Sequence, residues 1–415
     1  MYKGAKGTFY LFISEGARTA KQFFFTKNFT QIYPHKVNLT NYTVITSTST
    51  DQNIMSESNY NSTIEDQRAK ANFTFIECLF PGVSIDMELK RIFTSCTSKF
   101  QKIDIIQTSF GKTLVTDGKT QSTAMDEFAY HESLVHPSLL KAGVTLSSTN
   151  TQVSPPRKVF IGGGGELATA REVLKHKSVD RVLMVDLDEV VLRECQKYLH
   201  EWGGDAVATN PRLELKIGDA YAYLMSCEEK FDVIIMDISD PIEAGPGVML
   251  YTQEFYEHAK TLLNPNGVFV TQAGIGDGIA IPEGIVPGSD NDFTSFAASC
   301  NTLAAVFDNV LPYTVNIPSY GSDWGFIMAF DKTDEHQTED FGCLSVDLID
   351  ELVDHRVTDI NDVGKTDQEY KAGSDVLRYY DGISHRRMFA LPKPLRNILK
   401  TDKRIITKDN PVFMY

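Results

Sequence analysis

Two acidic residues are spaced so that their carboxylates could act together on a positively charged group. Asp237 and Asp240 stand three residues apart, directly after the largely apolar run 231–236 and before Pro241. A carboxylate pair on one short turn can bind an ammonium group and take a proton from it. An amine is protonated at neutral pH and becomes a nucleophile only after that proton has left. The pair therefore predicts a site that activates an amine.

A glycine-rich stretch followed by another acid predicts a nucleoside ligand. The apolar residues 159–161 lead into four consecutive glycines and Glu166, after which 168–176 has a helical pattern. Glycines at such a junction let backbone N–H groups approach a ligand closely. Roughly 20 residues further on, the run 181–185 ends at Asp186, the spacing at which a doubly wound fold presents an acid to a ribose diol. These features alone do not say which nucleoside is bound.

The alternation of strand-like and helical segments over 157–331 predicts a doubly wound α/β domain. Ligands of open α/β sheets lie outside the carboxyl ends of the strands. Polar side chains follow the expected strand ends, which predicts one cleft containing Glu166, Asp186, Asp219, Asp237, Asp240 and Gln272. Each acid taken alone, Asp219 in particular, could instead cap a helix or lie in a solvated loop. Strands are expected at 157–161, 181–186, 213–217, 231–236 and 268–272, helices at 168–176, 188–201, 252–263 and 293–307, and a closing antiparallel pair at 310–317 and 325–330.

The remainder of the chain divides into three parts. Residues 1–70 are polar and receive no function. Residues 71–145 are expected to form a small antiparallel domain, with strands at 73–80, 102–108 and 112–116 and an amphipathic helix over 125–143; 145–156 then connect it to the α/β domain. The tail 332–415 carries an expected helix at 346–355 and a basic run at 393–404 that is interpreted as solvated surface.

Composition limits the classes of function. The net charge of −15 disfavours nucleic acid and anionic membranes as partners and suits cationic ligands, although acidity also simply favours solubility. No apolar run is long enough to span a bilayer, and the start shows no secretory signal, so a cytoplasmic location is expected. The six cysteines lack CxxC spacing and the histidines lack an HExxH pattern, so neither disulfides nor a metal site is expected.

These residues together resemble the polyamine aminopropyltransferases, the spermidine and spermine synthase family. The similarity extends over about 75–331 and includes an N-terminal hairpin domain, matched at 98–101, 110–112, 117–121 and 126–132. The segments 240–246, 250–251, 271–274, 313–314, 323–325, 380–382 and 407–410 are further similar to thermospermine synthases. The central motifs are Gly163–Gly164–Gly165–Glu166, Asp186, Gly218–Asp219–Ala220 and Asp237–Ile238–Ser239–Asp240–Pro241.

The resemblance implies a Rossmann-like, methyltransferase-type doubly wound sheet behind a small antiparallel β-hairpin domain. It also implies transfer of an aminopropyl group from decarboxylated S-adenosylmethionine, a co-substrate rather than a tightly bound cofactor, to a polyamine. Homodimers or homotetramers formed through the hairpin domain would be typical. By the resemblance, Asp237 is the proton acceptor and Asp240 helps to hold the amine. The donor would contact Gln101, Gly163, Gly164, Gly165, Glu166, Asp186, Asp219, Ala220 and Pro246, and the acceptor Tyr130, His131, Glu166, Asp237, Asp240, Tyr251, Gln272 and Trp324.

Glu166 fits a decarboxylated donor, whose ammonium it would attract, better than intact S-adenosylmethionine, whose carboxylate it would repel. Leu167 and Ala220 depart from the family, which usually has glycine at the first position and often at the second; either could narrow the donor pocket or change the backbone. The resemblance favours thermospermine synthesis from spermidine. Spermidine synthase, spermine synthase, a small-molecule methyltransferase and a non-catalytic polyamine-binding relative are the alternatives.

Overall fold

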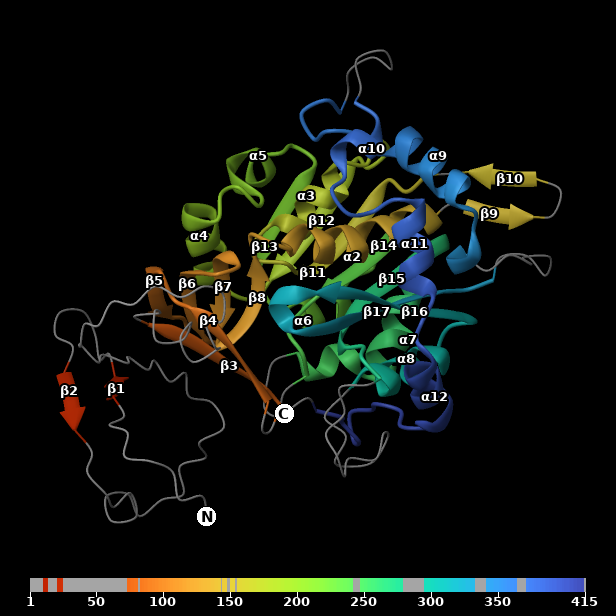
Figure 1. The fold of residues 1–415 in the computed structure, drawn as a ribbon. Coiled ribbons are helices and arrows are strands. Elements are labelled where there is room, and N and C mark those ends of the chain that lie inside the picture. Colours follow the sequence, from red (N-terminus) through yellow and green to blue (C-terminus); the bar gives the residue numbers. More distant parts are fainter. Residues whose placement is uncertain are drawn as a thin grey trace, which may run out of the picture. The chain divides into compact units, whose positions relative to one another are not determined.

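The computed structural model describes residues 10–13, 21–24, 73–80, 83–142, 144–147, 150–153, 155–241, 247–278, 295–332, 341–363 and 371–413 (Figure 1). The chain divides into two compact units, Met1–Met125 and Asp126–Tyr415. The sequence instead grouped the helix at 125–143 with the strands that precede it. This helix, α2 (Glu127–Lys141), lies in the second unit because it packs against α3 (Ala168–Leu174), β15 (Leu263–Ile275) and β16 (Asn309–Ile317).

The first unit consists of antiparallel strands. β3 (Thr74–Phe80) pairs with β4 (Val83–Glu88), and a four-stranded sheet contains, in order, β5 (Arg91–Thr97), β6 (Lys102–Thr108), β7 (Gly111–Thr116) and β8 (Lys119–Thr123). A separate pair is formed by β1 (Tyr10–Ile13) and β2 (Lys21–Phe24). Asp117 and Gly118 join β7 to β8 with positive φ, as a two-residue hairpin turn requires. The sequence did not indicate β8, because its five residues include no apolar side chain.

The second unit contains a seven-stranded sheet in the order β13 (Leu213–Ile217), β12 (Arg181–Asp186), β11 (Lys158–Gly163), β14 (Phe231–Asp237), β15, β17 (Ser322–Phe330) and β16. The first five of these strands are parallel, and β17 runs antiparallel between β15 and β16. This arrangement confirms the predicted doubly wound sheet with its closing antiparallel pair.

Helices cover both faces of this sheet, because successive side chains of a strand point to opposite sides. Val159 and Ile161 of β11 pack into one apolar cluster with α2 and α3, whereas Phe160 packs into a second with α6 (Ala220–Met225), α7 (Gln253–Thr261) and α8 (Phe296–Ala304). Among the described residues, no helix is long and apolar enough to cross a membrane. Two further helices of this unit are α4 (Glu189–Tyr198) and α5 (Gly204–Ala208). The segment predicted to connect the two domains contains a hairpin of β9 (Val144–Ser147) and β10 (Asn150–Val153).

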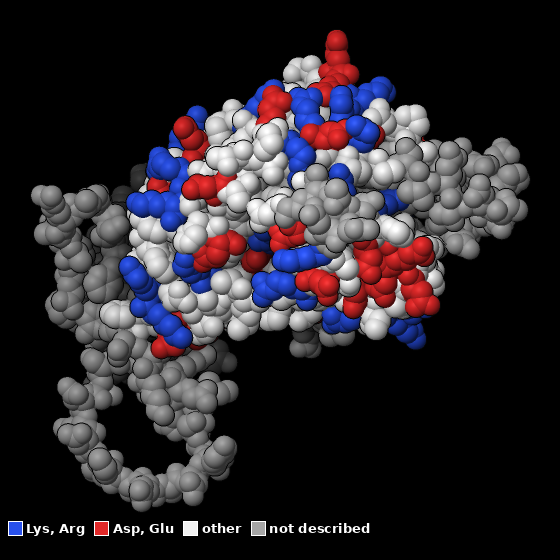
Figure 2. Space-filling model, turned by 90° about the horizontal axis from the view of Figure 1, so that it is seen from above, with Lys and Arg blue, Asp and Glu red and all other residues white. Residues whose placement is uncertain are grey.

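The C-terminal segment belongs to the second unit and adds the helices α9 (Val346–Arg356), α10 (Gly373–Val376), α11 (Gly382–Phe389) and α12 (Lys393–Thr401). The buried carboxylate of Glu132 on α2 accepts backbone hydrogen bonds from Arg378, Tyr379 and Tyr380. The basic run at 393–404 was expected to be solvated surface, but most of it is α12, which buries Leu395 and Ile398 while its basic side chains stay outside. On the face shown in Figure 2, basic side chains are interspersed among acidic ones.

Candidate active site

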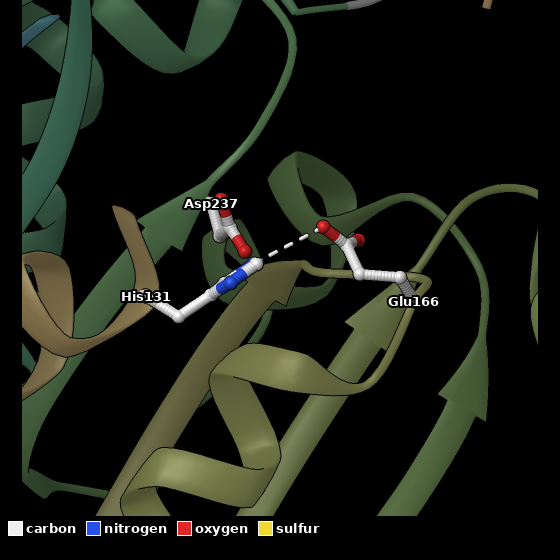
Figure 3. A group of neighbouring side chains, drawn as sticks. All are labelled: His131, Glu166 and Asp237. Carbon is white, nitrogen blue, oxygen red and sulfur yellow. Dashed lines mark hydrogen bonds and ion pairs between the residues drawn. The ribbon is translucent and has the colours of Figure 1, made fainter. Parts of the chain in front are cut away.

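Three side chains from different elements converge at the carboxyl ends of β11 and β14. His131 comes from α2, Glu166 from the loop between β11 and α3, and Asp237 from the last position of β14 (Figure 3). One nitrogen or oxygen atom of each lies within 4.8 Å of those of the other two. His131 Nε2 is 3.2 Å from Glu166 Oε1. The structure therefore brings together two of the acids that the sequence predicted for one cleft, Glu166 and Asp237, and His131, which the family resemblance assigned to the acceptor.

The glycines before Glu166 allow the backbone to come this close to Asp237. Gly163 pairs with Asp237 across the sheet, and a Cβ atom at Gly163 would lie 2.0 Å from the Asp237 carbonyl oxygen. The Gly164 N–H donates to that same oxygen at 3.0 Å, and both glycines have positive φ. A Cβ atom at Gly165 would lie 3.1 Å from Asp186 Oδ2. A larger residue at Gly163 would separate β11 from β14, so this glycine is required by the strand pairing itself.

Two hydroxyl groups hold the Asp237 carboxylate. Tyr130 Oη donates to Oδ1 at 2.8 Å, and Thr169 Oγ1 donates to Oδ2 at 2.5 Å. Burial, followed by the negative charge of Glu166, raises the pKa of Asp237, while the positive charge of His131 and the two hydroxyl donors oppose that rise. A carboxylate whose pKa lies above its ordinary value is a better proton acceptor than a solvated one.

His131 is buried and lies between two carboxylates. Its Nδ1 is 2.9 Å from Glu127 Oε2, one helical turn earlier on α2, and its Nε2 faces Glu166. Burial alone would lower the pKa of His131, but hydrogen bonds and charges from Glu127 and Glu166 raise it to about 10. At neutral pH the imidazole therefore carries a proton on both nitrogens and donates on both sides.

The same three residues are of the right types to hold a metal ion, within the part of the chain that the structure describes. Their chemistry disfavours one. Both Asp237 oxygens already accept hydroxyl hydrogen bonds, and a doubly protonated His131 offers no lone pair to a cation. The site is better suited to an organic ammonium, which can donate to carboxylates without displacing these bonds.

Asp186 and Asp219 follow neighbouring strands but differ in environment. Asp186 ends β12, accepts the Asp188 N–H at 2.8 Å and is buried. Burial, opposed by the Asp188 N–H and reinforced by the charges of Glu166, Asp188 and Asp237, raises the pKa of Asp186 to about 7. Asp219 is exposed and accepts the Tyr221 N–H at 2.8 Å as the N-cap of α6, which is the simpler interpretation that the sequence allowed for it.

The structure shows where the side chains at the two departures from the family pattern point. Leu167 has φ 70°, in the left-handed region that glycine favours, and its side chain is buried in the apolar cluster of α2 and α3, where it fills core space. Gly203 makes room for it, since a Cβ atom there would lie 2.5 Å from Leu167 Cβ. Ala220 is buried in the other apolar cluster. A Cβ atom added at Gly162 would lie 3.4 Å from the Cβ atom of Ala220.

A second group of predicted residues fixes the turn after β14. The side-chain amide of Gln272 lies 3.1 Å from Asp240 Oδ1, 2.6 Å from the Ile238 carbonyl oxygen and 2.7 Å from Tyr251 Oη. The Tyr251 hydroxyl, fully buried, lies 3.3 Å from the Ser239 carbonyl oxygen. Gln272 and Tyr251 therefore hold the backbone that presents Asp240.

Trp324 belongs to a group of aromatic rings that includes Tyr320 and Tyr130. Its ring meets Tyr320 edge to face at 4.7 Å, and Tyr320 in turn lies 6.1 Å from Tyr130. The Trp324 indole N–H is buried and has no hydrogen-bond partner among the described residues. A buried donor without a partner is costly unless a ligand or water accepts from it.

Two further residues, Gln101 and Pro246, were predicted to contact the donor. Gln101 belongs to the first unit, after β5, and Pro246 lies outside the described residues. Conversely, the sequence analysis missed Thr169, Arg171, Glu127 and Tyr320. Glu127 could have been found, because it stands four residues before His131 on an expected helix and so shares its face. Thr169 gave no such signal, because its contact with Asp237 joins residues 68 positions apart.

Comparisons with known proteins identify relatives of this chain. The family described as "Spermine/spermidine synthase domain" matches residues 127–340. A polyamine aminopropyltransferase from Aeropyrum pernix is 39% identical over 82% of this chain and 95% of its own length, and thermospermine synthase ACAULIS5 from Arabidopsis thaliana is 40% identical over 82% and 88%. A solved spermidine synthase in complex with the transition state analogue AdoDATO superposes with a TM-score of 0.61 at 28% identity, covering 78% of this chain and 94% of that one.

Proposed function

The chain belongs to the spermine/spermidine synthase family of polyamine aminopropyltransferases, and we propose that it transfers the aminopropyl group of decarboxylated S-adenosylmethionine to spermidine to make thermospermine. The choice of product is supported by the 40% identity with a plant thermospermine synthase over most of both chains. The observation that carries the chemistry is the half-buried Asp237 carboxylate, held by two hydroxyl donors beside Glu166 and His131.

In the proposed reaction, Asp237 accepts a proton from the attacking ammonium group of the polyamine. The freed nitrogen lone pair forms a bond to the aminopropyl carbon next to the sulfonium. The carbon–sulfur bond breaks, and its electron pair stays on sulfur, so methylthioadenosine leaves as a neutral thioether. No oxyanion forms, and positioning of the two substrates together with charge complementarity supplies most of the rate.

The donor is proposed to lie along the carboxyl ends of β11, β12 and β13. Asp186 accepts hydrogen bonds from its ribose diol, and the glycines 163–165 let its nucleoside approach the backbone. Glu166 binds the ammonium group of the donor. Intact S-adenosylmethionine would also bring a carboxylate, which Glu166 would repel. Gln101, Asp219, Ala220 and Pro246 remain predicted contacts of the same donor.

The acceptor is proposed to reach Asp237 past Asp240 and the aromatic residues. Asp240 attracts a second ammonium group of the polyamine, with Gln272 and Tyr251 fixing its turn. Tyr130 and His131 line the channel, and the indole of Trp324 borders it. A polycation suits this channel because carboxylates stand at more than one point along it.

A second candidate is spermidine synthesis from putrescine, which the likeness to solved spermidine synthases favours. The deciding experiment incubates purified protein with decarboxylated S-adenosylmethionine and either putrescine or spermidine, and separates the products by chromatography with mass spectrometry. We expect thermospermine from spermidine, resolved from its isomer spermine. Product only from putrescine would establish spermidine synthesis, spermine would establish the other isomer, and absence of methylthioadenosine with every acceptor would contradict transferase activity.

We also infer a homodimer or homotetramer and a cytoplasmic location, as the resemblance and the sequence led us to expect. Light scattering on the purified protein and cell fractionation test these two predictions. A monomer, or recovery in the membrane fraction, would contradict them.

A further inference from the structure

A row of side chains with alternating charge leads from the candidate site into the protein. We name it the charge chain; its members, in order, are Glu166, His131, Glu127, Arg171, Glu172 and Lys175. The successive contacts are 3.2, 2.9, 2.9, 2.7 and 2.6 Å long. Every member is at least four-fifths buried, and His131 and Glu172 are fully buried.

The middle of the charge chain has the geometry of strong ionic contacts. Arg171 holds both oxygens of Glu127, with its two terminal nitrogens 3.2 and 2.9 Å away. A planar guanidinium that meets a carboxylate in this forked way fixes its orientation as well as its charge. Arg171 is itself tied to the Trp202 carbonyl oxygen at 2.6 Å. Glu127 therefore has one available orientation, with Oε2 toward His131.

Four elements bring charged or titratable groups to His131. Glu127 and Tyr130 come from α2, Glu166 from the glycine loop and Asp237 from β14, while Arg171 of α3 acts through Glu127. Of the groups named here, three are carboxylates and one is a phenol, while the Arg171 guanidinium contacts Glu127 rather than His131. A positive charge on His131 is the arrangement that balances them.

We propose that Glu127, oriented by Arg171, is a positioning residue that keeps His131 a permanent cation between Glu166 and Asp237. The fixed cation has two consequences. It holds Glu166 in place before the donor arrives, and it stabilises the Asp237 anion, which must be unprotonated to accept a proton from the amine. This inference rests on the proposed function, since it takes Asp237 as the proton acceptor.

The test uses the full-length protein with Glu127→Gln. In this variant the His131 Nδ1–H can still donate to the Glu127 backbone carbonyl oxygen, 2.7 Å away, and Arg171 keeps Glu172 as its partner, so the change removes charge rather than fold. Glu127→Asp is the rescue variant, because it restores the carboxylate. Glu132→Gln is the matched control: it lies on the same helix and is as deeply buried, but its carboxylate faces the backbone of 378–380.

Two measurements are made on each protein. The ¹⁵N resonances of the His131 ring are followed between pH 5 and 10, and kcat/KM is measured across the same range. We expect wild-type His131 to stay protonated through pH 9 and to titrate at least one pH unit lower in Glu127→Gln. We also expect the acidic limb of kcat/KM to move about one unit upward in Glu127→Gln, because Asp237 without a neighbouring cation is protonated at higher pH. Glu127→Asp should reverse much of both shifts.

The inference is overturned if wild-type His131 titrates near its ordinary pKa, or if Glu132→Gln shifts both measurements as much as Glu127→Gln does. The two proposals fail separately. A protein that releases no methylthioadenosine contradicts the proposed function, while the NMR titration still decides the charge on His131. Normal turnover with an unchanged His131 titration in Glu127→Gln contradicts only the positioning role.

Discussion

Three aspartates that follow strands of the same sheet have different surroundings, and these surroundings set what each carboxylate can do. Asp237 is half-buried and held by hydroxyl donors, Asp186 is buried with a backbone donor, and Asp219 is exposed at a helix N-terminus. Desolvation raises the pKa of the first two, whereas exposure leaves the third free to act as a cap. Environment, rather than residue type, separates a proton acceptor from a structural acid.

Asp237→Asn should lower turnover by about 10²–10⁴-fold, the usual contribution of a positioned base, because an amide cannot accept the amine proton. Donor binding should change little, since the proposed donor contacts lie on Glu166 and Asp186. Calorimetry with methylthioadenosine and a coupled assay of its release measure the two effects.

Asp232→Asn is the control for this change, because Asp232 stands at the opposite end of the same strand and accepts the backbone N–H groups of Arg157 and Lys158. It should keep wild-type turnover once folded. Turnover retained in Asp237→Asn would remove Asp237 from the role of proton acceptor.

The affinity for methylthioadenosine should depend on pH through Asp186. Its pKa of about 7 means that the carboxyl group becomes protonated below neutrality, when it accepts ribose hydrogen bonds less well. We therefore expect the Kd of the wild-type protein to rise as pH falls from 8 to 6. In Asp186→Asn the Kd should be high and nearly constant over the same range. Isothermal calorimetry across this range measures both. An equally steep pH dependence in the variant would assign the effect to another group.

At the scale of single elements, the loop between β11 and α3 begins at two closely paired strands and ends at Leu167, whose backbone conformation is strained. Leu167, the N-cap of α3, has the left-handed conformation that glycine favours, yet its side chain is 1% exposed. A leucine with positive φ costs about 1–2 kcal/mol, and burying its side chain offsets this. Gly203 on the segment before α5 is what leaves space for that side chain.

Gly203→Ala should lower the free energy of unfolding by about 1–3 kcal/mol, as overpacking does. The φ of Gly203 is −146°, which alanine tolerates, so the cost comes from the 2.5 Å approach to Leu167 Cβ. In a Leu167→Gly background that atom is gone and Gly203→Ala should cost little, whereas in Leu167→Ala the cost should persist. Urea unfolding of the single and double variants measures this coupling. Equal costs in all three backgrounds would show that the two positions are independent.

At the scale of the whole second unit, buried ionisable groups link stability to pH. The pKa of His131 rises from about 6.5 in an unfolded chain to about 10 in the folded one. The folded state therefore binds a proton more tightly, and this stabilisation is fully present below pH 6.5 and disappears as pH rises through 10.

We expect the difference in unfolding free energy between wild type and His131→Gln to shrink between pH 7 and 10, by at most about 1.4 kcal/mol per pH unit. Urea unfolding at several pH values gives this difference directly. His200→Gln, at an exposed histidine, should follow wild type throughout. A constant difference for His131→Gln would mean that His131 is neutral in the folded protein.

The sequence by itself determined the sheet, its strand ends and the acids that follow them, because the period of apolar residues and the glycines after β11 are local signals. It also identified Asp237, Glu166 and His131 through motifs. It did not indicate that residues of α12 pack against the other helices and strands of the second unit, or that the Leu167 side chain points into the core. Only the tertiary structure decided these points, together with the two carboxylates that flank His131 and the hydrogen bond from Thr169 to Asp237. The reason is physical: burial and contacts between distant segments set pKa values and side-chain direction, and neither is encoded in local spacing.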